Sequence, residues 1–379
     1  MQKLFKKLGV LFVTVLCAMM LITACGKKED SNVEPEVSQD VNVEGDTTDS
    51  TDEGTDNDNT DDGSDSEDAT PAIDVESLKE QMGFYVDGTT LYDANGNPFI
   101  LRGVNHSHTW FTSQLETSLD AIADTGCNSV RIVLSNGAQW SMNSAKDVEK
   151  IIDYCKEKKM VAVLEVHDAT GYTDTESLIA CAQYFVFIKD VLIGEEDYVI
   201  INIANEWGGE RSKTWAEAYT EAIGMLREAG LSHTIMIDCC GWGQYAKCIK
   251  EKGEEVLAAD PLENVMFSIH MYGTAGGTDD KIKKNLEYAT SRDLCVCVGE
   301  FGYTHTDGDV DEGYLMQYCV DNAIGYMAWS WKGNGGGVEY LDLATEWDGS
   351  VLSPDWGEVF INGTNGIKET SVMCSVFEE

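Results

Sequence analysis

The feature that most constrains this chain is a regular alternation that runs from about residue 99 to about residue 331. Short runs rich in Val, Ile and other apolar residues alternate with longer stretches whose apolar residues recur with the period of a helix. The eight runs are FILRGVN, SVRIVLS, MVAVLEVH, YVIINIANE, TIMIDCCGW, NVMFSIHMY, LCVCVGEF and GYMAWSW. Near-continuous apolar strands separated by helices are typical of a parallel sheet that is covered on both faces. The sequence therefore predicts an α/β fold.

A closed (β/α)8 TIM barrel would pair all eight strands without leaving an edge. An open, doubly wound sheet is the alternative, but no glycine-rich phosphate loop follows the first strand. We therefore expect residues 76–379 to form one barrel domain. Ahead of its first strand, Asn95-Gly96 between two apolar runs predicts the turn of a hairpin.

The first seventy-five residues follow a different pattern. Residues 1–24 begin with lysines and continue as an apolar run, which is typical of an export signal peptide. The box Ile22-Thr23-Ala24-Cys25 resembles a bacterial lipoprotein processing site, which would leave Cys25 as a lipid-modified N-terminus at the cell surface. Ordinary secretion is the alternative. Residues 25–75 have the composition of a disordered acidic tether, and a partner-binding role for this tether is a further hypothesis.

Charge and cysteine usage narrow the classes of function. The formal net charge of −41 argues against nucleic acid as a partner, because phosphate neutralisation needs a basic face, and it is compatible with an uncharged substrate. Most cysteines after the tether lie inside apolar runs, such as Cys239 and Cys240, which predicts buried free thiols. No Cys-x-x-Cys pair indicates a zinc site. Nothing in the sequence demands an oligomer, so we expect a monomer.

Polar and aromatic residues gather at the carboxyl ends of the predicted strands. In barrels of this kind, the chemistry lies at the rim that these ends form. The ends carry Asn105, His106, Arg131, His167, Asp168, Asn205, Glu206, Gly241, Trp242, His270, Tyr272, Glu300, Trp329 and Trp331. The strand beginnings carry nothing comparable. The sequence therefore predicts that a substrate is held at this rim.

Two carboxylates stand out at the rim. Glu206 follows the fourth strand and Glu300 the seventh, and these strands lie on nearly opposite sides of an eight-stranded ring. Both side chains would then reach toward one bond, as the hydrolysis of a glycosidic bond requires. Either glutamate alone could be a structural carboxylate or a helix cap. The pair on one rim favours catalysis.

The neighbouring residues fit this chemistry. Arg131 and Tyr272 would keep an attacking carboxylate ionised, although Arg131 could form a structural ion pair and Tyr272 could fill a gap. His167 and His270 lack an obvious third ligand, so we expect them to form hydrogen bonds, and we expect neither a metal nor an organic cofactor. Asn205 would bind sugar hydroxyls. Indoles suit the apolar faces of sugars, and the candidates are Trp110, Trp207, Trp242, Trp329 and Trp331.

From about Gly83 to the C-terminus the chain resembles the family 5 glycoside hydrolases. The matching positions are Arg131 in SVRIVLS, His167 in VLEVHD, Asn205 and Glu206 in IANEW, His270 and Tyr272 in SIHMYG, Glu300 in VGEFG and Trp329 in AWSWKGN. The resemblance implies that Glu206 is the acid/base and Glu300 the nucleophile. The spacing of the residues alone could not have made that assignment.

The resemblance extends to a bacterial subfamily of endo-β-1,4-mannanases, through segments such as LEVHDATGY, CCGWGQY and AWSWKGNGGGVEYLDL. It implies a retaining enzyme that cleaves internal bonds of mannan, glucomannan or galactomannan. Further sugar subsites would be lined by His106, Trp110, Trp242 and Lys332. The alternatives are an endo-β-1,4-glucanase and a surface glycan-binding lipoprotein that has lost catalysis.

Overall fold

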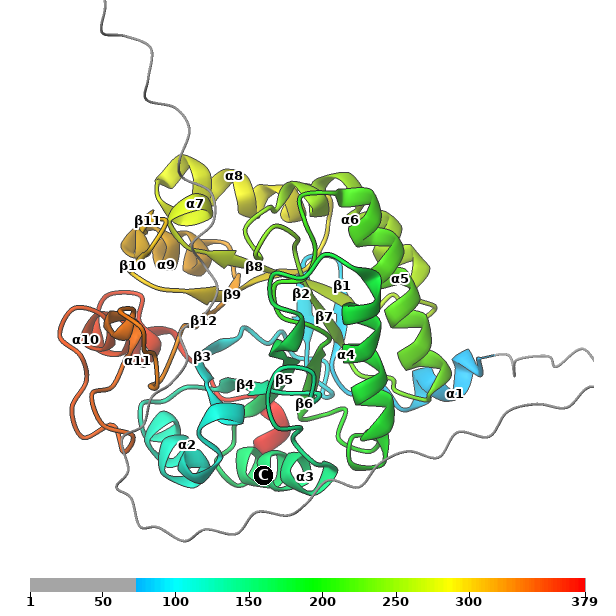
Figure 1. Cartoon of the computed structure of the whole chain (residues 1–379), viewed down its shortest axis with the longest axis horizontal. Coiled ribbons are helices and arrows are strands. Elements are labelled where there is room, and N and C mark those ends of the chain that lie inside the picture. Colours follow the sequence, from blue (N-terminus) through cyan, green and yellow to red (C-terminus); the bar gives the residue numbers. More distant parts are fainter. Residues whose placement is uncertain (1–72, 379) are drawn as a thin grey trace, which may run out of the picture. The chain divides into compact units, whose positions relative to one another are not determined.

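The computed structural model describes residues 73–378, in which eight parallel strands close into a barrel (Figure 1). The strands pair around the ring in the order β12, β3, β4, β5, β6, β7, β8 and β9. They are β3 (Arg102–His106), β4 (Ser129–Leu134), β5 (Val161–Val166), β6 (Val199–Asn202), β7 (Ile235–Asp238), β8 (Val265–Met271), β9 (Val296–Phe301) and β12 (Gly325–Ala328). The closed ring confirms the predicted barrel and excludes the open sheet. The predicted signal peptide, Cys25 and residues 25–72 of the predicted tether lie outside the described residues.

Helices between the strands form the outer layer of the barrel (Figure 1). The long ones are α2 (Leu115–Asp124), α3 (Ala145–Glu157), α4 (Thr175–Phe187), α5 (Ser212–Glu228), α6 (Lys247–Ala259), α8 (Asp279–Thr290) and α9 (Glu312–Asp321). The short ones are α1 (Val75–Glu80), α7 (Gly273–Gly276), α10 (Gly357–Asn362) and α11 (Ile367–Thr370). Ser144, Asp174 and Thr278 start α3, α4 and α8 by accepting a hydrogen bond from a backbone N–H of the first turn. No helix within residues 73–378 is both long enough and apolar enough to cross a membrane.

A hairpin of β1 (Tyr85–Asp87) and β2 (Thr90–Tyr92) precedes the barrel, and its turn differs from the predicted one. The chain reverses at Gly88, whose φ of +57° suits a residue without a Cβ. Asn95-Gly96 forms the next turn instead, which is closed by a single bridge between Tyr92 and Pro98. The Asn-Gly signal therefore marked a real reversal, but one turn further along the chain.

The interior of the barrel is divided into two layers. At the strand beginnings, inward-facing apolar side chains of β5 to β9 and β12 pack against Phe84, Leu91 and Phe99 from the hairpin region, which close this end. This layer contains Val161, Val163, Ile200, Met236, Met266, Cys295, Cys297 and Met327. Nearer the carboxyl ends, the inward-facing side chains are buried but polar: Asn105, Arg131, Glu165, Asn202, Asp238, Ser268, His270 and Glu300. Polar groups at this depth must satisfy one another, and they form the floor of the candidate site.

Candidate active site

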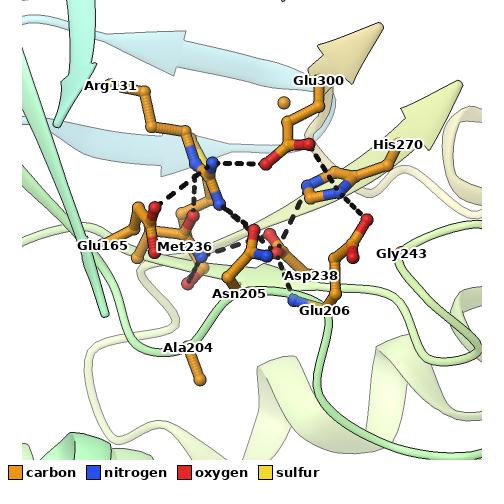
Figure 2. Close-up of polar contacts among 12 residues, drawn as sticks. Arg131, Glu165, Ala204, Asn205, Glu206, Met236, Asp238, Gly243, His270 and Glu300 are labelled. Carbon is orange, nitrogen blue, oxygen red and sulfur yellow. Dashed lines mark hydrogen bonds and ion pairs between the residues drawn. The ribbon is translucent and has the colours of Figure 1, made fainter. Parts of the chain in front are cut away.

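A β-bulge in β9 turns Glu300 into the barrel. Ile269 of β8 lies opposite Val298, but the next residue, His270, lies opposite Glu300, so Gly299 has no partner in the ladder. A Cβ on Gly299 would lie 2.2 Å from Oγ of Ser268, so any larger residue would force Ser268 or β9 to move. The bulge re-aims the following side chain. Glu300 and His270 consequently point toward one another (Figure 2).

Glu300 accepts a strong hydrogen bond on each carboxylate oxygen. Nη1 of Arg131 donates to Oε1 at 2.8 Å, and the phenol of Tyr272 donates to Oε2 at 2.9 Å. Nδ1 of His270 lies 3.5 Å from Oε2. These partners fix the position of the Glu300 carboxyl group. Burial and the charge of Glu300 raise the pKa of Tyr272 well above its usual value, which keeps the phenol protonated as a donor.

Arg131 organises the polar layer from the middle of β4. Its side chain is fully buried and donates to the amide oxygens of Asn105 at 2.9 Å and Asn202 at 2.8 Å. It also donates to the amide oxygen of Asn205 at 2.8 Å and to Glu300 (Figure 2). Burial alone would lower the pKa of Arg131, but nearby carboxylates, including Glu165, outweigh that effect and raise it. Arg131 is therefore a permanent cation whose rigid fork fixes both Glu300 and Asn205.

Glu206 lies four residues beyond the end of β6, and His270 lies between it and Glu300. Its φ is +47°, an uncommon backbone conformation for a residue with a Cβ. The backbone N–H of Glu206 donates to Oδ2 of Asp238 at 3.0 Å, and Nδ1 of His270 lies 2.8 Å from Oε1 of Glu206. One oxygen of Glu206 lies within 4.8 Å of one oxygen of Glu300. The two carboxylates therefore face a common point above the polar layer.

His270 lies between carboxylates, which favour its positively charged form. Burial alone would lower its pKa, but Glu300, Asp238 and Glu206 outweigh that effect and raise the pKa of His270 well above its usual value. Burial would likewise raise the pKa of Asp238, but His270 and Arg131 hold it well below its usual range. We therefore assign both ring nitrogens of His270 as protonated, so that Nδ1 donates to Glu206.

His167 and Asn205 form the next part of the rim. Nδ1 of His167 lies 3.0 Å from Oε1 of Glu165. Burial alone would lower the pKa of His167, but Glu165 raises it. Asn205 accepts from Arg131 and donates to Oγ1 of Thr170 at 2.9 Å, so its amide orientation is fixed.

Aromatic side chains surround His167. Trp329 stacks on the imidazole with ring centroids 5.6 Å apart, and Trp110 meets it edge-on at 5.1 Å. Trp140, which the sequence analysis did not single out, packs edge-on against Trp110 at 5.1 Å. Trp242 is 57% exposed, and its indole covers Gly171. Trp110, Trp140 and Trp329 therefore form an aromatic cluster around His167.

Lys332 lies farther along the rim, beside a surface pocket of about 260 Å³. The pocket is lined by Tyr303, Lys332, Glu339, Tyr340, Asp342, Thr345, Ser353, Pro354 and Asp355. Nζ of Lys332 is 3.7 Å from Oδ2 of Asp342.

Four predicted positions differ in the structure. The indole of Trp331 is fully buried and donates to the backbone oxygen of Trp347 at 2.9 Å, so the prediction that it stacks on a sugar is wrong. His106 is also fully buried, and it faces outward from β3 toward His108 and Trp347, because its neighbour Asn105 takes the inward position. Trp207 is a core residue as well. Arg131 does not end its strand but lies inside it.

Two buried acids complete the site and were missed. Asp238 ends β7 and lies within 3.5 Å of Arg131 and 3.3 Å of His270, while Glu165 lies 3.7 Å from Arg131. Each is a charged residue in an otherwise apolar strand, TIMID and VAVLEV. Because burying an isolated charge is costly, an acid in such a run indicates a buried cationic partner. That signal could have found both.

Glu206, His270 and Glu300 each offer one potential ligand atom, and these three atoms lie within 4.8 Å of one another. A metal ion would need the His270 nitrogen without its proton. The surrounding carboxylates favour the protonated ring instead. The chemistry of this set therefore fits proton transfer better than metal binding.

The chain is similar to proteins of one family over most of its described length. The model of cellulases of glycosyl hydrolase family 5 matches residues 92–335. A mannan endo-1,4-beta-mannosidase from Salipaludibacillus agaradhaerens is 48% identical over 298 residues, which cover 78% of this chain and 96% of that protein. Endoglucanase E-5 from Thermobifida fusca is 26% identical over 264 residues, which cover 65% of this chain and 55% of that protein.

Among solved structures, the mannohexaose complex of the Thermomonospora fusca beta-mannanase matches with a TM-score of 0.73 and 42% identity, covering 78% of this chain and 99% of that one. The matched family segment contains both glutamates and every residue that holds them. The protein therefore belongs to glycosyl hydrolase family 5.

Proposed function

We propose that this protein is a retaining endo-β-1,4-mannanase that hydrolyses internal bonds of mannan, glucomannan or galactomannan. The observation that carries the proposal is the separation of Glu206 and Glu300, whose nearest ligand oxygens lie within 4.8 Å at the mouth of the barrel. Retaining glycosidases place their carboxyl groups about 5–5.5 Å apart, whereas inverting enzymes need about 6.5–9.5 Å to admit a water molecule. The 48% identical relative named as a mannan endo-1,4-beta-mannosidase supports the choice of substrate.

In the first step, an oxygen of Glu300 attacks the anomeric carbon while Glu206 gives its proton to the leaving glycosidic oxygen. The bond to the leaving sugar breaks, and a covalent glycosyl–enzyme ester forms at Glu300. Arg131 and Tyr272 hold the attacking carboxylate in place, since they donate to its two oxygens. Glu206 suits the acid role because its carboxylate accepts from His270 alone among the described side chains and is the more exposed of the pair.

In the second step, Glu206 acts as a base. It removes a proton from a water molecule, which attacks the anomeric carbon from the opposite face and releases Glu300. Two inversions at one carbon give overall retention. Between the steps Glu206 carries a negative charge, which the hydrogen bond from the His270 imidazolium stabilises.

The surrounding residues position the sugar. The fixed amide of Asn205 suits a hydrogen bond to the 2-hydroxyl of the sugar, and Trp329, Trp110 and Trp140 offer faces for stacking. Trp242 and Lys332 would contact sugars farther along the chain. His167 would contribute a hydrogen bond from Nε2.

The decisive experiment compares reducing-end release from mannan, glucomannan and carboxymethylcellulose, and follows the anomeric configuration of the first products by proton NMR. We expect internal cleavage of mannan with β-anomers formed first. Faster cleavage of carboxymethylcellulose than of mannan would identify an endo-β-1,4-glucanase, and α-anomers formed first would refute the retaining mechanism.

A non-catalytic glycan-binding protein is tested by Glu300→Ala. The variant should lose turnover by several orders of magnitude, roughly the full effect of removing a nucleophile, while binding of mannohexaose is largely kept. If wild type and Glu300→Ala release sugar at the same rate, Glu300 is not the nucleophile.

We also propose that the protein is exported and held at the bacterial cell surface through a lipid on Cys25. The apolar run of residues 1–24 and the box that ends at Cys25 support this proposal. Radiolabelled palmitate should enter the wild-type protein and not Cys25→Ala. If neither protein is labelled, the lipid anchor is refuted and ordinary secretion is the better explanation of residues 1–24.

A further inference from the structure

Asp238 is a buried carboxylate that lies beside Glu206, His270 and Arg131 at once (Figure 2). Its side chain is fully buried at the end of β7. Oδ1 accepts from Nδ2 of Asn202 at 3.2 Å, which anchors the carboxylate from below. Oδ2 is the atom directed toward Glu206 and His270.

The first contact fixes the backbone of the acid/base. The N–H of Glu206 donates to Oδ2 of Asp238 at 3.0 Å, and Glu206 has the unusual φ of +47°. A residue in this conformation persists only where its surroundings hold it. Asp238 therefore holds the turn that directs Glu206 back over the barrel.

The second contact reaches the carboxylate of the same residue through His270. Nε2 of His270 lies 3.3 Å from Oδ2 of Asp238, a close ion pair that is not aligned as a hydrogen bond, and Nδ1 lies 2.8 Å from Oε1 of Glu206. The imidazolium is thus enclosed by two acids, with Glu300 as a third neighbour at 3.5 Å. Arg131, at 3.5 Å, is the other cation beside Asp238.

We propose that Asp238 is a positioning residue for the acid/base, which acts by holding the Glu206 backbone and by keeping His270 doubly protonated as the donor to Glu206. The inference rests on the proposed function. Asp238 exchanges no proton with substrate. It instead stabilises the cation that donates to Glu206 after Glu206 has given its proton away.

The role of Asp238 is tested by measuring how kcat/KM depends on the leaving group of the substrate. A dinitrophenolate leaves without proton assistance, whereas a phenolate needs it, so loss of the acid affects only the second kind of substrate. For Asp238→Asn, kcat/KM should fall about 10- to 100-fold with phenyl β-mannobioside and stay within about threefold with dinitrophenyl β-mannobioside. An equal loss with both substrates, or no loss with either, would overturn the proposal.

The pH profile gives a second readout. The negative charge of Asp238 is one of the causes that raise the pKa of His270. Without this charge, His270 should lose its proton at lower pH, so the imidazole of His270, followed by NMR, should titrate at lower pH in Asp238→Asn than in wild type. An unchanged titration of His270 would contradict the role of Asp238 toward it.

The matched control is Asp260→Asn. Asp260 is equally buried and accepts two hydrogen bonds of 2.9 Å from Arg227, but it lies on the outer wall after α6, away from the two glutamates. Its variant should lower Tm and leave the ratio of the two kcat/KM values unchanged. If Asp238→Asn does not fold, Asp238→Glu keeps the charge but shifts the carboxylate by one methylene, and the same two-substrate comparison applies.

Failure of the proposed function would look different. If the wild-type enzyme cleaves the corresponding cellobiosides and not the mannobiosides, the proposed substrate is wrong. The same test of Asp238 would then use phenyl and dinitrophenyl β-cellobioside. A wild-type enzyme without activity on either pair would refute the hydrolase itself.

Discussion

Nη1 of Arg131 lies 2.8 Å from Oε1 of Glu300, and both side chains are buried inside the barrel. The contact joins the middle of β4 to the bulged end of β9, across the axis of the ring. It sets the direction from which Glu300 approaches a substrate. Arginine is needed here because its fork also reaches the amides of Asn105, Asn202 and Asn205.

Replacing Arg131 should therefore affect activity even when its charge is kept. In Arg131→Lys one ammonium cannot reproduce four hydrogen bonds in fixed directions, so we expect kcat on mannan to fall about 10²- to 10³-fold, as for the loss of a preorganised donor. Steady-state kinetics on mannan with thermal unfolding of the same sample measures this. A kcat within about threefold of wild type would show that a point charge is sufficient.

The bulge in β9 depends on Gly299. In Gly299→Ala the added Cβ would meet Ser268 at 2.2 Å and His270 at 3.4 Å, so β9 or His270 must shift. We expect kcat to fall at least about tenfold and the free energy of unfolding to decrease by roughly 1–3 kcal/mol, the usual range for overpacking. The control is Gly224→Ala within α5, where nothing lies within 4 Å. That variant should gain about 0.5–1 kcal/mol and keep its activity. Equal effects of the two would contradict a special role for Gly299.

Of the two tryptophans Trp331 and Trp242, both predicted to lie at the rim, replacement of the first should affect stability and replacement of the second should affect substrate binding. Trp331 is fully buried, so Trp331→Ala should cost about 3–5 kcal/mol of unfolding free energy, measured by urea denaturation. Trp242 is 57% exposed, so Trp242→Ala should leave stability within about 0.5 kcal/mol and instead raise KM for mannan. A destabilised Trp242→Ala with unchanged KM would reverse these assignments.

Buried neutral histidines predict a loss of stability in acid. Burial lowers the pKa of His106 and of His233 from 6.5 to about 3. Between these values the unfolded chain binds a proton on each ring that the folded chain does not. Stability therefore falls as the pH decreases from 6.5 toward 3, by roughly 1 kcal/mol per pH unit for each histidine.

His106→Phe isolates one of these contributions. Neither ring nitrogen of His106 has a hydrogen-bond partner among the described residues, so a phenyl ring removes the titration without orphaning a partner. The slope of unfolding free energy against pH, from urea titrations between about pH 4 and pH 6, should decrease by about 1 kcal/mol per unit relative to wild type. An unchanged slope would mean that His106 is protonated in the folded state.

The sequence predicted the strands because apolar residues dominate each run, and such runs separated by helical stretches are typical of a parallel sheet covered on both faces. It also located Glu206 and Glu300, since both end such runs. The direction of Glu300 was not predictable in the same way. In LCVCVGEF the inward side chain of Cys297 would, by strict alternation, place Gly299 inward and Glu300 outward. Only the bulge, a relation between two strands, reverses this.

Alternation could have been used further at other positions. Asn105 and His106 are neighbours on β3, so only one can face the barrel interior, and Met236 and Asp238 are two apart on β7, so both face it. Alternation does not apply to Trp331, because β12 ends at Ala328 and the following chain folds back into the core. Predictions made from strand ends alone missed which side each residue faces.

Because the barrel interior is divided into an apolar layer and a polar layer, thermal stability and catalytic activity can be changed by substitutions in different layers. The apolar layer contains Met236, Met266, Cys295, Cys297 and Met327, whose sulfur-containing side chains are polarisable and open to oxidation. Replacing them with branched aliphatic residues of similar volume would make the enzyme more resistant to oxidation without changing the residues of the polar layer.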